Sequence, residues 1–472
     1  MAIPEGWEVV VGLEVHTELL TETKMFSAAP NRFGGEPNTN IDPVTLGLPG
    51  SLPVLNRKAV ELAIRAGLAL NCRVQRSVFA RKNYFYPDMP KDYQISQYEL
   101  PINGEGWLQL PSGKVVGIER AHLEEDTGKS THMGSGGGRI HDAEYSLVDY
   151  NRAGVPLLEI VGQPDLRSAE EAREYVSELR AILVAVGASD GKMEEGSLRV
   201  DCNVSVRRAG ETDYGTRCEI KNVNSLRSLG RAIDYEARRQ IDLICAGERV
   251  AQQTRHWNEE EGRTHTLRSK EEATDYRYFP EPDLVELDPD PEWIEEIRAA
   301  LPPLPAQRRA GLVQRCGATT PHAGIIVERD LDALVLDALD AGGDAERLVT
   351  HAVHNLSDER AAQLDPVGFA ALTSMEATGD LTATQAKTVL AEMVSTGDSP
   401  EAIAAKLGFE AMAAGELESI VDGLIVAHPD DWAKFVAGEN KVMGFFVGQV
   451  MKATQGKADG KAVSAILNSK RG

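Results

Sequence analysis

Strand-like segments with acidic polar faces are the feature that most restricts how this chain can fold. In a strand, residues two apart share a face, so Glu14 and His16 lie on the same side of the first such segment. The opposite side is apolar and consists of Val9, Val11, Leu13 and Val15. Carboxylates recur in strand-like segments at 122–126 and 197–201. Such strands side by side predict a sheet with one apolar face and one acidic face.

An acidic sheet face of this kind suits magnesium and the phosphates that accompany it. Hard oxygen ligands hold Mg²⁺, whose charge offsets that of a nucleotide. Glu14, Glu124 and Glu125 are therefore metal-ligand candidates. His16 is a further candidate through its neutral imidazole, although magnesium prefers oxygen and a histidine would be a minority ligand.

Other strand-like segments extend the polar face. Their polar residues alternate with apolar positions and are Glu159, Arg199, Asp201, Asn203, Glu219 and Lys221. Taken singly, each segment is typical of an antiparallel sheet with one solvated face. Together, the mixture of carboxylates with arginine, lysine and asparagine favours a site for a nucleotide and its metal.

The charge balance excludes indiscriminate nucleic-acid binding. The net charge is −23, whereas such binding depends on lysines and arginines that neutralise phosphates. Basic residues nevertheless gather at one end, because residues 441–472 contain six lysines or arginines and a single acid, Asp459. We expect a nucleic acid to contact patches of this kind rather than the whole surface.

Composition also predicts the compartment. No apolar run approaches the ~18 residues of a membrane span, and the first residues lack the basic start and apolar stretch of a signal peptide. Five scattered cysteines without a CxxC pair indicate reduced thiols rather than a disulfide framework. We expect a cytoplasmic protein with no membrane partner.

Proline-rich stretches divide the chain. Prolines interrupt helices and strands, and they crowd residues 279–305. The strand-rich part, residues 1–293, is predicted to be an α+β domain. Residues 294–400 show helical spacing of alanine and leucine and predict a helical domain, and residues 401–472 predict a small helical tail.

Some helices are recognisable from their sequence signals. Ser168 and Glu171 form a capping-box pattern, and Gly187 can close that helix. A second helix is expected from Ser225 to Ala246. Two periodic segments, 399–407 and 441–453, are expected to be helical.

Three other motifs are less specific. Gly128-Lys129-Ser130 resembles the end of a phosphate-binding P-loop, but position 123 is leucine where that motif requires glycine. The glycine-rich patch 134–139 is expected to be a loop. The aromatic and basic run 82–93 can stack bases or ribose, and it can equally be a packed loop.

Longer motifs, taken in order, resemble one known family. They are GLEVH at 12–16, RKNYFYPD at 81–88, YQISQ at 93–97, HLEED at 122–126, NRAGVP at 151–156, MEEGSLR at 193–199, EIKN at 219–222, DYRYFPEPD at 275–283 and MGFFVGQVMK at 443–452. This combination resembles the GatB family, the B subunits of the bacterial aspartyl/glutamyl-tRNA amidotransferases, over almost the whole chain.

The resemblance implies a fold and a reaction. The catalytic domain is expected to be cradle-shaped, similar to glutamine synthetase and the guanidino kinases. Mg-ATP is expected to phosphorylate the side-chain carboxylate of glutamate or aspartate misattached to tRNA(Gln) or tRNA(Asn), and ammonia then displaces phosphate. The protein would be part of a heterotrimeric carbon–nitrogen ligase, in which an amidase (the A component) supplies ammonia from glutamine and a small third protein (the C component) braces the two.

The resemblance also assigns residues. The expected catalytic residues are Glu125, Arg199 and Lys82. The expected metal ligands are Glu14, His16, Glu124 and Glu125. The expected nucleotide contacts are Arg199, Asp201, Asn203, Glu159 and Lys221. The expected tRNA contacts, on the basic tail, are Lys441, Lys452, Lys457 and Lys461.

One departure from the family pattern concerns zinc. Many members have a four-cysteine zinc site, and the corresponding positions here are Ser27, Ala29, Asp42 and Thr45. A tetrahedral site of that kind cannot form without thiolates. We expect no structural zinc and expect this region to depend on packing.

Two other functions stay open at this stage. The chain could be a tRNA-binding scaffold that does not turn over ATP, or a free-standing ATP-dependent ligase for a small amino acid. The carboxylates and Arg199 disfavour the first alternative, and the helical region with its basic tail disfavours the second. The sequence does not decide between tRNA(Gln), tRNA(Asn) and both.

Overall fold

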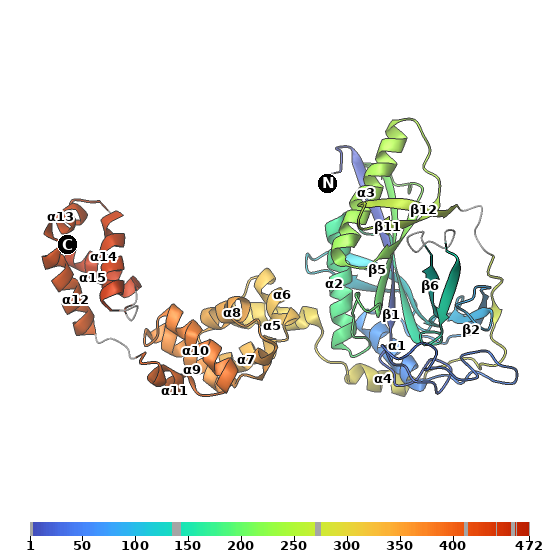
Figure 1. The fold of residues 1–472 in the computed structure, drawn as a ribbon, viewed down its shortest axis with the longest axis horizontal. Helices are drawn as coiled ribbons and strands as arrows, with labels where there is room; N and C mark the ends of the chain where they lie inside the picture. The colour runs from blue at the N-terminus through green and yellow to red at the C-terminus, as the bar shows by residue number, and fades with distance from the viewer. Residues whose placement is uncertain are drawn as a thin grey trace. The chain divides into compact units, whose positions relative to one another are not determined.

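A computed structural model describes residues 3–134, 143–269, 275–409, 414–439, 441–454, 458 and 460–471. The chain consists of two compact units, Met1–Pro305 and Ala306–Gly472, which are described separately (Figure 1). The predicted glycine-rich loop lies outside the described residues except for Gly134. Within the described ranges, no helix combines the length and the apolar character needed to cross a membrane.

One large mixed sheet dominates the first unit and confirms the predicted α+β class. Eleven strands of its described residues take part. Their spatial order is β12 (Arg263–Ser269), β11 (Gln253–Asn258), β10 (Cys218–Val223), β9 (Leu198–Arg208), β1 (Trp7–Glu18), β8 (Pro156–Gly162), β5 (Val115–Glu125), β3 (Tyr93–Gln97), β2 (Phe79–Asn83) and β13 (Phe279–Pro280), with β4 (Gly106–Gln109) paired to β5. The pair β10 and β11 is parallel, whereas β1 pairs antiparallel with both of its neighbours.

The apolar face of the sheet is buried, as the alternation in β1 predicts. Its residues Val9, Val11, Leu13 and Val15 belong to the main core of the unit. Helices α2 (Ala169–Ala185) and α3 (Leu226–Cys245) pack against each other on this side of the sheet (Figure 1). Burial of one sheet face under helices leaves the opposite face for polar residues.

The two predicted helices start at their predicted caps. The Ser168 side chain accepts a hydrogen bond from the Glu171 N–H, and the Ser225 side chain accepts one from the Ser228 N–H. The capping box is incomplete, because the Glu171 carboxylate accepts a hydrogen bond from the backbone N–H of Arg167 instead of that of Ser168.

Strand register aligns the polar residues of β1 with those of both neighbours. His16 lies opposite Glu159 on β8 and opposite Arg199 on β9. Glu14 lies opposite Asp201 on β9. Directly opposed residues in an antiparallel pair point to the same face, so these side chains gather on one surface.

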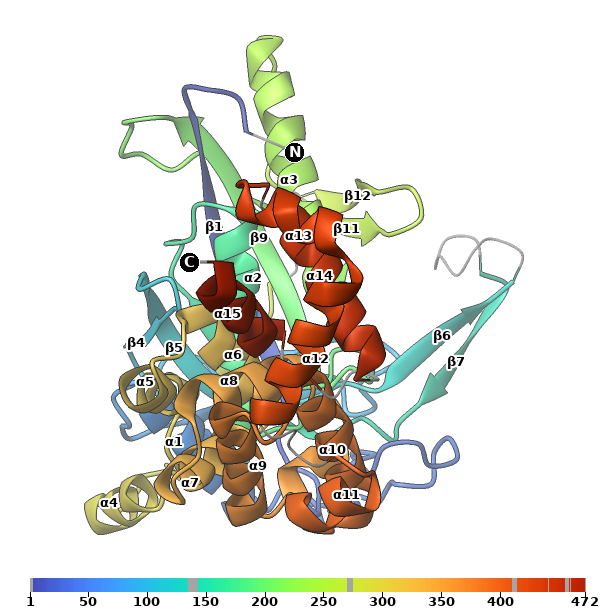
Figure 2. The ribbon, with the colours of Figure 1, turned by 90° about the vertical axis from the view of Figure 1, so that its left-hand side faces the viewer.

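Two helices and a two-stranded hairpin complete the first unit. Helix α1 (Arg57–Ala69) packs against α4 (Pro291–Ala299), which lies within the proline-rich stretch and contributes Ile297 to the core of the sheet unit. Strands β6 (Lys129–Met133) and β7 (Tyr145–Asp149) form a separate hairpin that extends away from the rest of this unit (Figure 2).

The second unit is helical throughout its described residues. Its helices are α5 (Pro305–Cys316), α6 (Thr320–Glu328), α7 (Asp332–Asp340), α8 (Ala345–His354), η3 (Glu359–Gln363), α9 (Pro366–Thr378), α10 (Ala383–Thr396), α11 (Pro400–Lys406), α12 (Ala414–Ala427), α13 (Pro429–Val436), α14 (Lys441–Ala453) and α15 (Gly460–Arg471). One hydrophobic core joins residues 312–404 and another joins residues 417–467. The predicted helical segments at 399–407 and 441–453 are confirmed as α11 and α14.

Candidate functional site

A first group of possible metal ligands lies where β1, β8 and β5 meet. His16, Glu124 and Glu159 each offer one ligand atom, and these atoms lie within 4.8 Å of one another. His16 Nε2 is 3.4 Å from Glu159 Oε2, and His122 Nε2 is 3.3 Å from the same oxygen. The Ser96 hydroxyl donates a hydrogen bond of 3.1 Å to Glu124.

A second group lies next to it, across β1, β9 and β10. Glu14, Asp201 and Glu219 bring three carboxylate oxygens within 4.8 Å of one another. The Asn203 amide donates a 2.9 Å hydrogen bond to Glu14. Lys221 Nζ lies 2.5 Å from Asp201 and 2.7 Å from Glu219, so one cation already partly offsets this concentration of negative charge.

Electrostatics couple His16 to its neighbours. Burial lowers the pKa of His16, but the hydrogen bond and charge of Glu159, with the charges of Glu124 and Asp201, outweigh burial and raise it to about 9. Burial raises the pKa of Glu159, but His122 and His16 hold it well below its usual range. The charge of Glu159 thus favours the protonated form of His16, and the two histidines favour the ionised form of Glu159.

Negative charge is crowded in the second ligand group, and a bound cation would relieve the repulsion. The pKa of Glu14 is raised, first by burial and then by the charges of Glu159, Glu219 and Asp201. Carboxylates placed this closely disfavour one another's ionised forms, and a divalent cation removes that penalty. Oxygen ligands at this spacing fit Mg²⁺ better than a softer metal.

An ion-pair cluster borders both groups. Arg199 Nη2 lies 2.5 Å from Asp126 Oδ2, and Arg152 Nε lies 3.5 Å from the same oxygen. Burial alone raises the pKa of Asp126, but the two arginines hold it below its usual range. The pKa of Glu18 is raised to about 7, first by burial and then by Asp126, against the opposing effect of Arg199 and Arg152.

Glu125 lies apart from both groups of ligands. Adjacent residues of a strand point to opposite faces, so Glu124 faces the polar side and Glu125 does not. The Glu125 carboxylate pairs with Lys91 and accepts a 2.8 Å hydrogen bond from the backbone N–H of Ile95. The four expected metal ligands therefore do not all lie together. His16, Glu14 and Glu124 belong to the two ligand groups, whereas Glu125 forms a buried ion pair elsewhere.

Comparison with known proteins gives matches over nearly the whole chain. The family described as the GatB/GatE catalytic domain matches residues 9–295, and the one described as the GatB domain matches residues 346–470. A relative from Thermosynechococcus vestitus, named as the B subunit of an aspartyl/glutamyl-tRNA(Asn/Gln) amidotransferase, is 45% identical over 98% of this chain and 96% of its own length. A relative of the same name from Thermoanaerobacter pseudethanolicus is 46% identical over 98% of both chains.

The chain belongs to the GatB family of amidotransferase subunits. The first matched region covers both ligand groups and ends within α4. The resemblance inferred from the motifs is thus confirmed.

Four residues on the polar face of this GatB-family chain are not among the site residues predicted from the sequence. They are Glu18, His122, Asp126 and Arg152. The period of two from Glu14 and His16 leads directly to Glu18, and His122 and Asp126 are part of the HLEED motif. Arg152 is part of the NRAGVP motif, but it lies in a turn, and its contact with Asp126 depends on the fold.

Lys82 lies at the margin of the same face. It is opposite Gln94 on β3, two residues before Ser96, which contacts Glu124. Its Nζ atom is 4.8 Å from the centre of the Tyr276 ring. The aromatic run that contains Lys82 is therefore partly strand, with Tyr84 and Tyr86 stacked at 4.7 Å.

The four positions at which a zinc site was considered from the resemblance form other contacts. Ser27 Oγ and Thr45 Oγ1 are 3.4 Å apart, and the Asp42 carboxylate accepts a 2.8 Å hydrogen bond from the Thr45 N–H. The Ala29 N–H donates to Ser27 Oγ at 3.3 Å. The contact between the two hydroxyls connects the segments around residues 27 and 45, and the other two hydrogen bonds lie within one segment each.

The predicted tRNA contacts are only partly within the described chain. Lys441 and Lys452 are exposed on α14. Lys457 lies outside the described residues, as does the side chain of Lys461. Lys470, on α15, is paired with Asp422 at 2.9 Å.

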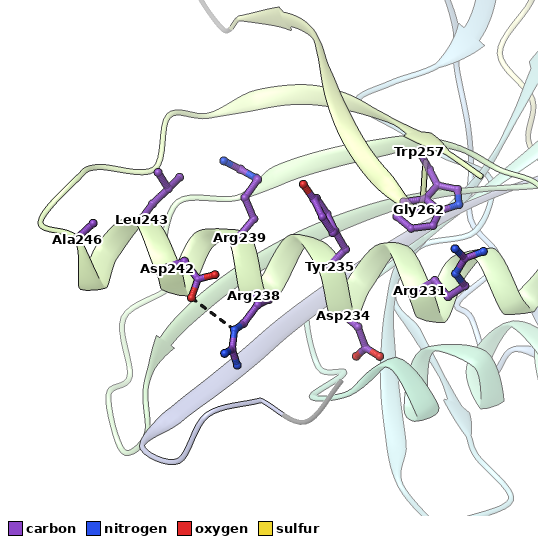
Figure 3. Close-up of a pocket in the computed structure, with 10 residues that line it drawn as sticks. All are labelled: Arg231, Asp234, Tyr235, Arg238, Arg239, Asp242, Leu243, Ala246, Trp257 and Gly262. Atoms are coloured by element: carbon purple, nitrogen blue, oxygen red, sulfur yellow. Dashed lines mark ion pairs between the residues drawn. The ribbon is translucent and has the colours of Figure 1, made fainter. Parts of the chain in front are cut away.

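A pocket of about 610 Å³ lies at α3 and the β11–β12 hairpin, away from the two ligand groups (Figure 3). Its arginines have carboxylate partners: Arg238 lies 3.5 Å from Asp242, and Arg239 lies 2.5 Å from Glu236. None of the residues that line this pocket belongs to either ligand group.

Proposed function

We propose that this chain is the component of a tRNA-dependent amidotransferase that activates a side-chain carboxylate with Mg-ATP. The substrate is glutamate or aspartate misattached to tRNA(Gln) or tRNA(Asn). The observation that carries the proposal is the adjacency of two ligand groups, His16–Glu124–Glu159 and Glu14–Asp201–Glu219, on neighbouring strands of one face. Family membership supports the same reaction class.

The reaction has two balanced steps. A carboxylate oxygen of the substrate attacks the γ-phosphorus of ATP, the bond to the bridging oxygen breaks, and ADP leaves. Ammonia then attacks the carbonyl carbon, a proton is lost, and inorganic phosphate departs with the former carboxylate oxygen. The first step is needed because a carboxylate is a poor electrophile, whereas an acyl phosphate has a good leaving group.

The residues of the polar face have separable roles in this proposal. Magnesium, when bound, offsets the charge of the phosphates. The ligand groups hold it through carboxylate oxygens, with His16 as a minority ligand. Arg199 and Lys221 lie beside the two groups, where they stabilise negative charge on the transferring phosphoryl group. Asp201, Asn203 and Glu159 orient these groups, and Lys82 contributes charge at the margin.

The proposal extends to the fold, the compartment and the partners. The first unit is a cradle-like catalytic domain of the glutamine synthetase and guanidino kinase type, and the helical unit divides near residue 400 into a helical domain and a tail. The protein acts in the cytoplasm as a carbon–nitrogen ligase within a heterotrimer. The amidase component releases ammonia from glutamine, the small third component braces the assembly, and the tail lysines contact tRNA.

The decisive experiment measures Mg²⁺-dependent ADP formation by the chain co-purified with its amidase partner. The assay compares wild type with Glu159→Gln, with and without glutamyl-tRNA(Gln). We expect tRNA-dependent ADP formation in the wild type and a loss of at least about 100-fold in the variant, because Glu159 touches His16 and His122 and belongs to the first ligand group.

Glu105→Gln is the matched control, because Glu105 is exposed just before β4. This control should retain wild-type activity. ADP formation that ignores tRNA would favour a small-molecule ligase. ADP formation that survives Glu159→Gln would remove the polar face from the reaction and favour the scaffold function.

A further inference from the structure

Two tyrosines stack at the margin of the polar face. The rings of Tyr98 and Tyr278 have centroids 4.2 Å apart and planes inclined by 9°. Tyr98 follows β3, whereas Tyr278 immediately precedes β13, so the fold brings together distant parts of the chain. Tyr276 packs edge-on against Tyr278 at 6.3 Å.

The tyrosine stack adjoins the first ligand group. Ser96 lies opposite Glu124 across β3 and β5, and Tyr98 directly follows β3, two positions further along the chain. The pKa of Tyr278 is raised, first by burial and then by the charges of Glu124 and Glu159, which links this tyrosine to the same carboxylates.

The stack is partly open to solvent. Tyr98 is 53% exposed, although it is stacked on a partner ring. Tyr98 therefore presents an open aromatic surface beside the carboxylates, and Lys82 supplies a positive charge near Tyr276.

We propose that Tyr98 and Tyr278 form a stacking platform for an adenine ring. This inference rests on the proposed function and adds the location of a base-binding subsite to it. Neighbouring strands lie ~4.8 Å apart, so the path from β3 across β5 and β8 to β1 is about 14 Å. An adenosine with phosphate groups extended over the polar face spans a comparable distance, with its base at the tyrosines and its phosphates at the ligand groups.

The adenine can belong to ATP or to the 3′-terminal adenosine of the tRNA. Both present the same flat ring, and stacking on an aromatic side chain does not distinguish them. Measurement separates the two sources. The tyrosines affect the binding of ATP in the first case and the binding of the tRNA in the second.

The test uses the chain co-purified with its amidase partner and compares Tyr98→Leu with Tyr98→Phe. Tyr145→Leu is the matched control, because Tyr145 is 57% exposed on β7, in the separate hairpin. The dissociation constant of Mg-ATP is measured by equilibrium dialysis without turnover, and KM is measured separately for ATP and for glutamyl-tRNA(Gln). Circular dichroism verifies that each variant is folded.

If the platform holds the base of ATP, Tyr98→Leu weakens Mg-ATP binding by about tenfold or more, and Tyr98→Phe restores it because the ring remains. If the platform holds the tRNA terminus, KM for glutamyl-tRNA(Gln) rises by a similar factor while Mg-ATP binding is unchanged. Values equal to those of Tyr145→Leu in both measurements would overturn the inference. A wild-type complex that binds Mg-ATP and forms ADP only with tRNA would then still support the proposed function.

Discussion

At the scale of single residues, strand alternation decides which carboxylates meet. The pattern in β1 is sufficient to predict that Glu14 and His16 share a face, and the structure confirms it. The same rule separates Glu124 from Glu125, although the sequence motif predicts metal binding for both. Contacts that cross several strands, such as that of Arg199 with Asp126, depend on strand order, which one sequence does not contain.

The His16–Glu159 pair predicts an unusual titration. Because the pKa of His16 is raised to about 9, its imidazole carries a proton at neutral pH in the metal-free protein. The pair stabilises the fold fully below the usual histidine pKa, near 6.5, and this contribution is lost as the pH rises through about 9. We expect histidine side-chain NMR to show this titration, assigned by its absence in His16→Asn.

The Glu159→Gln variant tests the cause of that titration. Removing the carboxylate leaves the burial of His16 but not its counter-charge, so the His16 pKa should fall by about one unit or more. Added Mg²⁺ should also lower the apparent value, because a ligating imidazole must be neutral. An unchanged His16 titration in Glu159→Gln would contradict the ion pair.

Glu18 also predicts a loss of stability as the pH rises, but over a lower pH range. Its pKa is raised to about 7, so ionisation of the folded protein becomes costly as the pH rises from about 4.5 to about 7. The free energy of unfolding of Glu18→Gln is compared with that of wild type at two pH values. The difference, variant minus wild type, should be about 1–3 kcal/mol larger at pH 8 than at pH 4. Urea denaturation at the two pH values measures this difference, and Glu22→Gln, at an exposed position, is the control.

At the scale of elements, local sequence signals located the starts of some helices but did not predict how many helices the tail contains. The cap serines located the starts of α2 and α3. The tail contains α12, α13 and α15 in addition to the predicted α14. These helices lack clear serine caps in the sequence, and they bury their apolar residues against one another, so tertiary packing rather than local propensity defines them.

A buried polar network attaches α3 to the β11–β12 hairpin. Glu236, on α3, lies 2.5 Å from Arg239 and 3.3 Å from Arg255. The Thr264 hydroxyl donates a 2.9 Å hydrogen bond to the Glu236 carboxylate. A buried charge that loses its partners retains its desolvation penalty, so removing Glu236 should affect stability more than removing an exposed acid.

This network predicts that Glu236 and Arg255 are strongly coupled in their contributions to the free energy of unfolding. Glu236→Leu should lower the free energy of unfolding by about 3–5 kcal/mol, because it leaves two arginines without their shared acid. Adding Arg255→Met to that variant should recover part of the loss, so the double variant is less destabilised than the sum of the single variants. Urea denaturation measures all four proteins. Strictly additive losses would show that Glu236 and Arg255 do not interact.

At the scale of the whole molecule, the chain consists of two units with separate hydrophobic cores. The division predicted at residue 293 rests on the proline-rich stretch, residues 279–305. It did not reveal that α4 belongs to the first unit, where Arg57 lies 4.6 Å from the centre of the Trp293 ring. Prolines mark interruptions of regular structure, whereas membership of a core depends on contacts between distant residues.

The position of α4 predicts how the first unit can be isolated. A fragment of residues 1–305 should fold cooperatively and bind Mg-ATP. A fragment of residues 1–290 lacks α4 and exposes the surface that covered Ile297, so its midpoint of thermal unfolding should be lower by several degrees. Calorimetry of both fragments measures the difference, and equal midpoints would show that α4 is not part of the first unit's stable core.

The opposite orientations of Glu124 and Glu125 make β5 intolerant of small changes in length. One residue inserted between His122 and Glu124 would turn Glu124 away from Ser96 and give its place to a neighbour in the chain. The Lys91 ion pair would lose its acid in the same event. Insertions and deletions in this strand can therefore preserve both environments only in steps of two residues.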